Sequence, residues 1–131
     1  TRRACFSASH LYRLSELSDD DNSAFFGPCS IAPGHGHNYE LIVHVTGSID
    51  PITGYVMDIK VLRDLIKSEV EDAFDHKNLN VQVPEFQNLI PTAENIVVVI
   101  YNKLRPHLDT SQDLEVVLYE TPRNFVKYAG E

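Results

Sequence analysis

At 131 residues the chain has room for one domain, residues 1–131, and its 43% hydrophobic and 23% charged residues are typical of a globular protein. The formal net charge of −8 argues against a surface for nucleic acid or anionic membranes, and no apolar run approaches the roughly 20 residues of a membrane helix. The two cysteines, Cys5 and Cys29, are too few for a disulfide framework, which indicates a reducing compartment and predicts a cytoplasmic protein.

The first predicted element is a strand from Arg2 to His10. Side chains alternate between the two faces of a strand, so Phe6 and Ala8 share a face with His10, whereas Cys5 falls on the other. We expect Cys5 to be a small buried hydrophobic residue. His10 taken alone is best interpreted as a core histidine with its hydrogen bonds satisfied.

A short helix and a loop are predicted next. Ser18 is a natural N-cap, and the three aspartates after it suit the positive end of a helix dipole. Gly27-Pro28 stops this helix, which leaves residues 29–33 as a loop. Cys29 lies six residues before His35 and is a candidate nucleophile or base, because a thiol loses its proton more easily beside a cation. The alternative is a half-buried loop cysteine without a chemical role.

The stretch Gly-His-Gly-His-Asn-Tyr at 34–39 leads directly into a predicted strand. Alternation places His35 and His37 on one face and turns His44 to the other. Two adjacent imidazoles can bind a borderline-soft cation, and the glycines leave it room. With His10 as a third ligand, three neutral imidazoles and an open fourth position describe a catalytic zinc site. The alternative is an exposed pair of histidines at a strand entry.

The middle of the chain is predicted to hold a turn, a strand and a helix. Residues 50–54 form a hairpin-type turn that leads into a return strand at 55–57. Asp58 caps an amphipathic helix from Ile59 to about Phe74. The dipeptide Asp75-His76 follows, and its carboxylate can hold the imidazole in one tautomer and raise its basicity. This dipeptide indicates a functional role only if its side chains lie near the metal.

The last third of the chain is predicted as a helix and two strands. Thr92 is the natural cap of a second helix, which Pro106 ends. In the strand at 114–120, Glu120 ends an otherwise apolar face. A carboxylate in that position suggests a bound hydrogen-bond donor. After a turn, residues 125–128 form the final strand.

The predicted order is therefore β-β-α-α-β-β, an α+β chain with two helices on one face of a four-stranded antiparallel sheet. Apart from the short return strand at 55–57, the four strands are 2–10, 40–45, 114–120 and 125–128. Such a sheet leaves free edges. Oligomerisation that closes several sheets into a barrel would remove them.

Six motifs occur in order along the chain: Phe6-Ser7-Ala8-Ser9-His10, Phe26-Gly27-x-Cys29, Gly34-His35-Gly36-His37-Asn38-Tyr39, Asp75-His76-Lys77-Asn78-Leu79, Thr92-x-Glu94-Asn95 and Tyr119-Glu120-Thr121. Together they resemble the family of 6-pyruvoyl-tetrahydropterin and 6-carboxy-tetrahydropterin synthases, from end to end and without large gaps. The resemblance implies the tunnelling fold (T-fold), in which trimers stack into hexamers and the active sites lie between subunits.

The resemblance also implies roles for individual residues: His10, His35 and His37 as ligands of one zinc ion per chain, Cys29 as the proton-abstracting thiolate, Asp75 and His76 as its proton relay, Glu120 as the anchor of the pterin ring, and Thr92 as a further substrate contact.

The implied enzyme is a carbon–oxygen lyase of tetrahydrobiopterin biosynthesis. It converts 7,8-dihydroneopterin triphosphate to 6-pyruvoyl-tetrahydropterin with loss of triphosphate, and Mg²⁺ is expected on the triphosphate. A buried carboxylate suits the pterin edge, which offers two parallel N–H donors. The implied partners are this small molecule and further copies of the chain, with no nucleic acid and no membrane.

The chain departs from the family pattern at two places. Leu11-Tyr12 follow His10 where the family tends to have Arg-Leu, and residues 30–33 replace a segment that is rich in asparagine in the eukaryotic synthases. The nearest alternative is 6-carboxy-5,6,7,8-tetrahydropterin synthase of the queuosine pathway, but the spacing from Cys29 to His35 favours the pyruvoyl enzyme. A variant that cleaves the substrate side chain carries glutamate at the cysteine position, so Cys29 argues against it. A catalytically inactive pterin- and zinc-binding homologue is the third alternative, although every catalytic position is filled.

Overall fold

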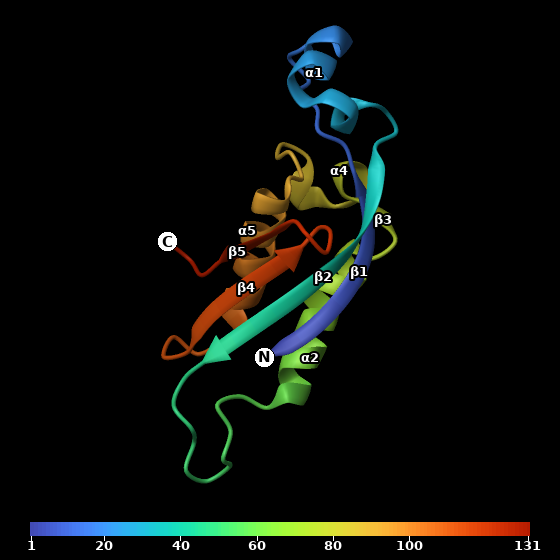
Figure 1. Ribbon diagram of the computed structural model, residues 1–131. Coiled ribbons are helices and arrows are strands. Elements are labelled where there is room, and N and C mark those ends of the chain that lie inside the picture. The colour runs from blue at the N-terminus through green and yellow to red at the C-terminus, as the bar shows by residue number, and fades with distance from the viewer.

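The computed structural model describes residues 1–131 and has an α+β fold built on one mixed sheet (Figure 1). The strands are β1 (Arg2–His10), β2 (His35–Thr46), β3 (Lys77–Asn78), β4 (Asp113–Tyr119) and β5 (Phe125–Tyr128), in the order β3-β1-β2-β4-β5. The four predicted strands pair antiparallel, as expected. The short β3 pairs with β1 in parallel and was not predicted.

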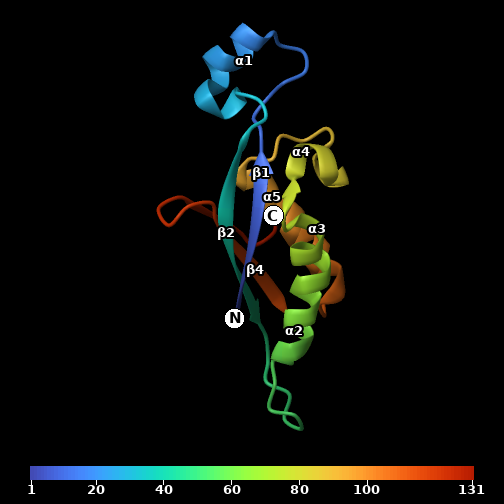
Figure 2. The ribbon, with the colours of Figure 1, turned by 90° about the vertical axis from the view of Figure 1, so that its right-hand side faces the viewer.

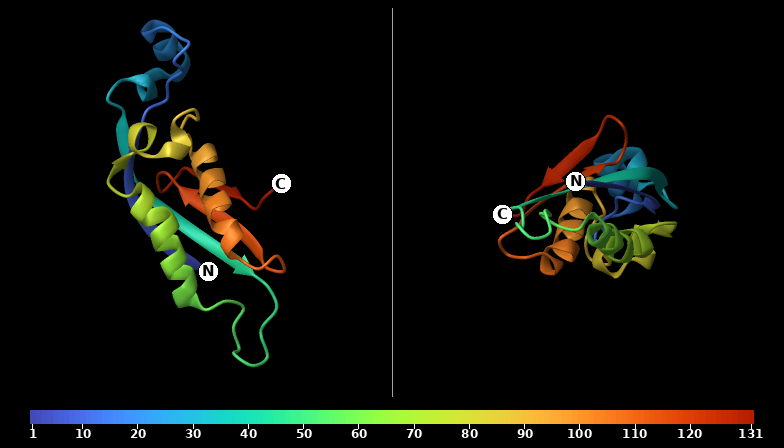
Figure 3. Two further views of the ribbon diagram at one scale, coloured as in Figure 1. Left: turned by 180° about the vertical axis from the view of Figure 1, so that it is seen from behind. Right: turned by 90° about the horizontal axis from the view of Figure 1, so that it is seen from below.

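The two long helical segments cover one face of the sheet. Figures 2 and 3 show α2, α3 and α5 on the same side, while the opposite face carries no helix. The helices are α1 (Asp19–Phe26), α2 (Ile59–Ile66), α3 (Asp72–Phe74), α4 (Leu79–Gln82) and α5 (Ala93–Leu104), with a π-helical turn at Lys67–Glu71 between α2 and α3. No helix is both long enough and apolar enough to cross a membrane.

The predicted helix starts are confirmed by their capping bonds. The Asp58 side chain accepts from the Lys60 N–H at 2.8 Å at the start of α2, and the Thr92 hydroxyl accepts from the Asn95 N–H at 3.2 Å at the start of α5. The helical segment predicted from Ile59 to about Phe74 is continuous, although its third turn is π-helical. Glu69 lies in that turn, and its carboxylate is 3.3 Å from the His107 ring rather than in the apolar stripe.

The core lies between the sheet and these helices. Phe6 of β1 and Tyr39 of β2 pair across the strands with ring centroids 4.9 Å apart, and the ring of Phe74 contacts Phe6 from the helix side. The same face of β1 ends in His10, which is fully buried. The apolar core face of β1 is therefore directly continued by a histidine side chain.

Two sequence-based expectations are wrong, and both concern how the sheet is covered. Residues 55–57 form no strand, because β1 and β4 already occupy both edges of β2 and leave none for a return strand. Cys5 is exposed rather than buried, because its side of β1 belongs to the face without helices. Its neighbour Ala4, on the helix side, is buried instead.

Candidate metal centre

Three histidines converge where β1 ends and β2 begins. His10 pairs directly with His35 in the strand register, and His37 pairs with Ala8, so all three imidazoles leave the sheet on its helix side. One ring nitrogen from each lies within 4.8 Å of the others. The loop before β2 must approach β1 closely, and a Cβ at Gly34 would lie only 2.4 Å from the His10 carbonyl oxygen. Glycine at this position, with φ of 101°, makes that approach sterically feasible.

The hydrogen bond to Pro91 determines which nitrogen of His10 is free to bind a metal. His10 Nδ1 lies 2.7 Å from the Pro91 carbonyl oxygen, which can only accept, so Nδ1 carries the proton and Nε2 keeps its lone pair. That Nε2 lies 3.1 Å from His35 Nε2. His37 Nε2 is buried without a hydrogen-bond partner. An unpaired buried polar atom costs about 1–3 kcal/mol, a penalty that a bound cation would remove. Three imidazole nitrogens are a donor set that fits Zn²⁺.

The electrostatics of the cluster favour neutral imidazoles. Burial lowers the pKa of His10, an effect that the hydrogen bond to Pro91 and the charge of Glu120 oppose and that the neighbouring histidines reinforce. Burial likewise lowers the pKa of His37, again opposed by Glu120 and reinforced by His35. Neutral imidazole is the form that binds metals, so these shifts favour the metal-binding form of His10 and of His37 at neutral pH.

A carboxylate and a cavity lie beside the histidines. Glu120 follows β4 and ends its core face as predicted, with one oxygen 3.6 Å from His37 Nε2 and the other 3.5 Å from the Tyr12 hydroxyl. Its side chain is only 18% exposed. A cavity of about 390 Å³ opens next to it, lined by residues from three segments: Tyr12, Ala93, Glu94, Glu120, Arg123, Asn124, Phe125 and Val126. Thr92 caps α5 immediately before the part of that helix that lines this cavity.

Cys29 is connected to the cluster through the backbone of Tyr12. It lies half-buried in a 3₁₀ turn, Gly27–Ser30, rather than in an open loop, and its carbonyl accepts from the Tyr12 N–H at 2.9 Å. Tyr12 in turn packs edge-on against the His10 ring, with centroids 4.9 Å apart. The thiol is not among the atoms of the three-histidine cluster.

Asp75 and His76 do not join the histidines within one chain. Asp75 Oδ1 accepts from the Ser7 N–H at 2.8 Å, and the His76 N–H donates to the Ser7 carbonyl at 2.6 Å, so both residues flank the outer edge of β1. The His76 side chain is 84% exposed. With Ser9, Asn38 and His37 it lines a cavity of about 480 Å³, although the His76 ring is not among the groups of the three-histidine cluster.

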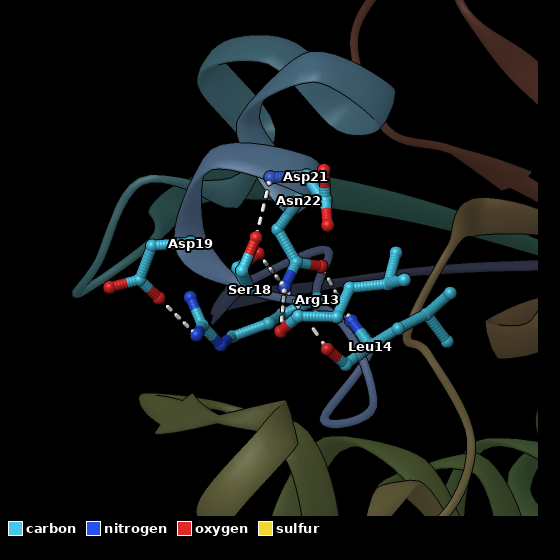
Figure 4. A network of polar contacts seen from close by, with 7 residues as sticks. Arg13, Leu14, Ser18, Asp19, Asp21 and Asn22 are labelled. Carbon is cyan, nitrogen blue, oxygen red and sulfur yellow. Dashed lines mark hydrogen bonds and ion pairs between the residues drawn. The ribbon is translucent and has the colours of Figure 1, made fainter.

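A buried asparagine fixes the segment that follows the first histidine. Figure 4 shows Asn22 of α1 at the centre of this network. Its amide donates to the carbonyls of Leu14, Leu17 and Ser18 at 3.0–3.1 Å, and its oxygen accepts from the Leu14 N–H at 2.9 Å. Sequence reasoning missed Asn22, because a polar residue in the first turn of a short helix gives no sign that it is buried.

Comparison with known proteins extends this picture. A sequence profile described as 6-pyruvoyl tetrahydropterin synthase matches residues 1–131. A relative from Pongo abelii called 6-pyruvoyl tetrahydrobiopterin synthase is 44% identical over 131 residues, covering 100% of this chain and 90% of the relative. The solved structure of Caenorhabditis elegans 6-pyruvoyl tetrahydropterin synthase is 36% identical, covers 99% of this chain and 93% of its own, and superposes with a TM-score of 0.91. A 6-carboxy-5,6,7,8-tetrahydropterin synthase from Rickettsia conorii is 32% identical over 111 residues, covering 71% of this chain and 80% of the relative. The chain therefore belongs to the 6-pyruvoyl tetrahydropterin synthase family, and the resemblance and the T-fold inferred from the sequence are confirmed.

Proposed function

We propose that the chain converts 7,8-dihydroneopterin triphosphate to 6-pyruvoyl-tetrahydropterin with elimination of triphosphate, in tetrahydrobiopterin biosynthesis in the cytoplasm. Family membership supports the prediction of an enzyme, a carbon–oxygen lyase acting on phosphates. The observation that carries the proposal is the convergence of three imidazoles beside Glu120 and its cavity. That arrangement offers one place for a cation and another, next to it, for the pterin ring.

His10, His35 and His37 would hold one Zn²⁺ per chain, with a fourth position left for water or substrate. An all-nitrogen donor set favours zinc over Mg²⁺ or Ca²⁺, which prefer oxygen ligands. When bound, zinc supplies Lewis-acid polarisation of the side-chain oxygens of the substrate. The protein supplies orientation, because the Pro91 carbonyl fixes the His10 ring in one tautomer. Mg²⁺ is assigned to the triphosphate.

Glu120 would bind the pterin ring. The edge of the ring presents two parallel N–H donors, and a carboxylate can accept both in a bidentate pair. The burial of Glu120 next to the cavity supports this role, since a buried carboxylate without donors is costly. Thr92 would contribute a contact at the start of α5, whose next residues line the same cavity.

Proton transfer would use Cys29 as the base and the Asp75–His76 pair as a relay. Because that pair lies on the outer edge of β1 in the same chain, we take it from a neighbouring copy. Free sheet edges support such an assembly: β3 covers only Ala8 and Ser9 of β1, and β5 has no strand on its outer side. Closure of these edges in trimers that pair as hexamers would form the barrel and place the active sites between subunits.

The second candidate is 6-carboxy-5,6,7,8-tetrahydropterin synthesis, because a relative of that name matches the chain. That match covers 71% of the chain, whereas relatives called 6-pyruvoyl tetrahydrobiopterin synthase match all of it at higher identity. The full-length match favours the pyruvoyl reaction. An inactive homologue that only binds zinc and pterin would show no turnover in the assay that follows.

The proposal is tested by the release of triphosphate. Protein stripped by a chelator is reloaded with Zn²⁺ and incubated with 7,8-dihydroneopterin triphosphate and Mg²⁺. We expect one triphosphate per substrate from the reloaded protein and almost none from the stripped protein. Absence of release by fully zinc-loaded protein would contradict the proposed reaction. Omission of Mg²⁺ in a parallel sample tests its role on the substrate.

A further inference from the structure

Tyr12 contacts both halves of the candidate site. Its ring packs edge-on against His10 and His35, with centroid distances of 4.9 and 6.4 Å, and its hydroxyl lies 3.5 Å from Glu120 Oε2. The residue therefore lies between the three histidines and the carboxylate that ends the core face of β4.

The backbone around Tyr12 is held by side chains from distant segments. Asn80 accepts from the Leu11 N–H at 2.7 Å and donates to the Leu11 carbonyl at 2.8 Å. The Tyr12 N–H is bound by the Cys29 carbonyl, and Asn22 fixes the turn that follows (Figure 4). The backbone of Tyr12 is therefore fixed on both sides, and its ring packs edge-on against His10 and Phe26, with centroid distances of 4.9 and 6.2 Å.

The Glu120 carboxylate has few other partners. Besides the contact with the Tyr12 hydroxyl, its oxygens have one further polar contact, with His37 Nε2 at 3.6 Å. If His37 held a metal ion through this nitrogen, as the proposed function requires, the nitrogen would have no proton to donate to the carboxylate. The Tyr12 hydroxyl is then the remaining hydrogen-bond donor from this chain that orients the carboxylate.

We propose that Tyr12 is a positioning residue for pterin binding: its hydroxyl donates to Glu120 Oε2 and holds the carboxylate in the plane that receives the ring edge. This inference rests on the proposed function. Each carboxylate oxygen has two lone pairs, so Oε2 accepts from Tyr12 and from the pterin at the same time. Tyr12 and Glu120 line the same cavity, which places the hydroxyl at the wall of the pterin site.

A double-mutant cycle tests this coupling. Zinc-loaded wild type, Tyr12→Phe, Glu120→Gln and the double variant are titrated with neopterin, a pterin without triphosphate, and its fluorescence gives the Kd. We expect Tyr12→Phe to raise the Kd about tenfold, with kcat changed less than about twofold, because only the orientation of the ring anchor is lost. In the Glu120→Gln background the same change should raise the Kd by less than about twofold.

Tyr55→Phe is the matched control, because Tyr55 is 53% exposed and belongs to the loop between β2 and α2. That loop follows the end of β2, whereas His35 is the first residue of the strand (Figure 1). It should leave the Kd unchanged, and all variants should retain the zinc content of wild type. An unchanged Kd in Tyr12→Phe, or an equal loss with and without Glu120, would overturn the inference alone. Wild type that neither binds neopterin nor releases triphosphate would overturn the proposed function, and this inference with it.

Discussion

Replacing His35 with alanine should remove most of the zinc affinity and leave the fold intact. His35 is the first residue of β2 and is only half-buried, so its side chain contributes little to the core. His10, in contrast, is fully buried and hydrogen-bonded to Pro91. Its replacement could change the zinc affinity through an effect on folding as well as through loss of a ligand. Zinc sites of four protein ligands bind with about 10–16 kcal/mol, or roughly 3–4 kcal/mol per ligand. Loss of one ligand should therefore raise the zinc Kd by about 10²–10³-fold.

The assay is competition with a chelator of known affinity, together with the metal content of each purified sample. His44→Ala is the matched control, because His44 lies on the same strand but belongs to the opposite face, where its ring bonds to Thr1. The control should bind zinc as wild type does. If His35→Ala retains one zinc per chain at wild-type affinity, the reasoning from strand register to ligand set is refuted.

Three further predictions concern catalysis, assembly and acid stability. Cys29→Ser should keep zinc but lower the rate of triphosphate release by about 10²-fold or more, which is the usual contribution of a positioned acid–base group. Near-wild-type release at full zinc would indicate that another residue, His76, is the base. Sedimentation of the purified protein should show hexamers, and a stable monomer at micromolar concentration would contradict both the barrel and the shared site. Burial lowers the folded-state pKa values of His10 and His37 from the ordinary 6.5, so the unfolded chain binds protons more readily. The free energy of unfolding of the metal-free protein should therefore fall as the pH is lowered from about 6.5 through the lower folded-state pKa values. Denaturant unfolding at a series of pH values measures this free energy. A free energy that does not fall over this range would contradict the account.

The parts of the site that follow from local patterns could be predicted from the sequence. Strand alternation places His35 and His37 on one face, and the same rule places Glu120 at the end of an apolar face. The contact of His10 with His35 depends on the register of two strands that are far apart in sequence, which no local pattern specifies. The position of His10 at the end of an apolar run makes it a candidate third ligand, the family resemblance supports that choice, and the paired strands explain the contact.

The errors and omissions arise where tertiary context decides the structure. The strand expected at 55–57 has turn-like surroundings and suitable residues, but no free edge of β2 remains for it. β3 is only Lys77 and Asn78, too short to show an apolar alternation. Asn22 and Asn80 act through bonds to backbone groups of distant or irregular segments, so their importance appears only in the folded chain.

The most direct test of the account is the mass of the product formed from 7,8-dihydroneopterin triphosphate by the zinc-loaded protein. The pyruvoyl, carboxy and side-chain-cleaved pterins differ in mass, so one spectrum distinguishes the three reactions and the absence of any. The account predicts that 6-pyruvoyl-tetrahydropterin is the main product and that it is absent from samples without zinc. A product with the mass of the 6-carboxy compound, or unchanged substrate at full zinc occupancy, would contradict it.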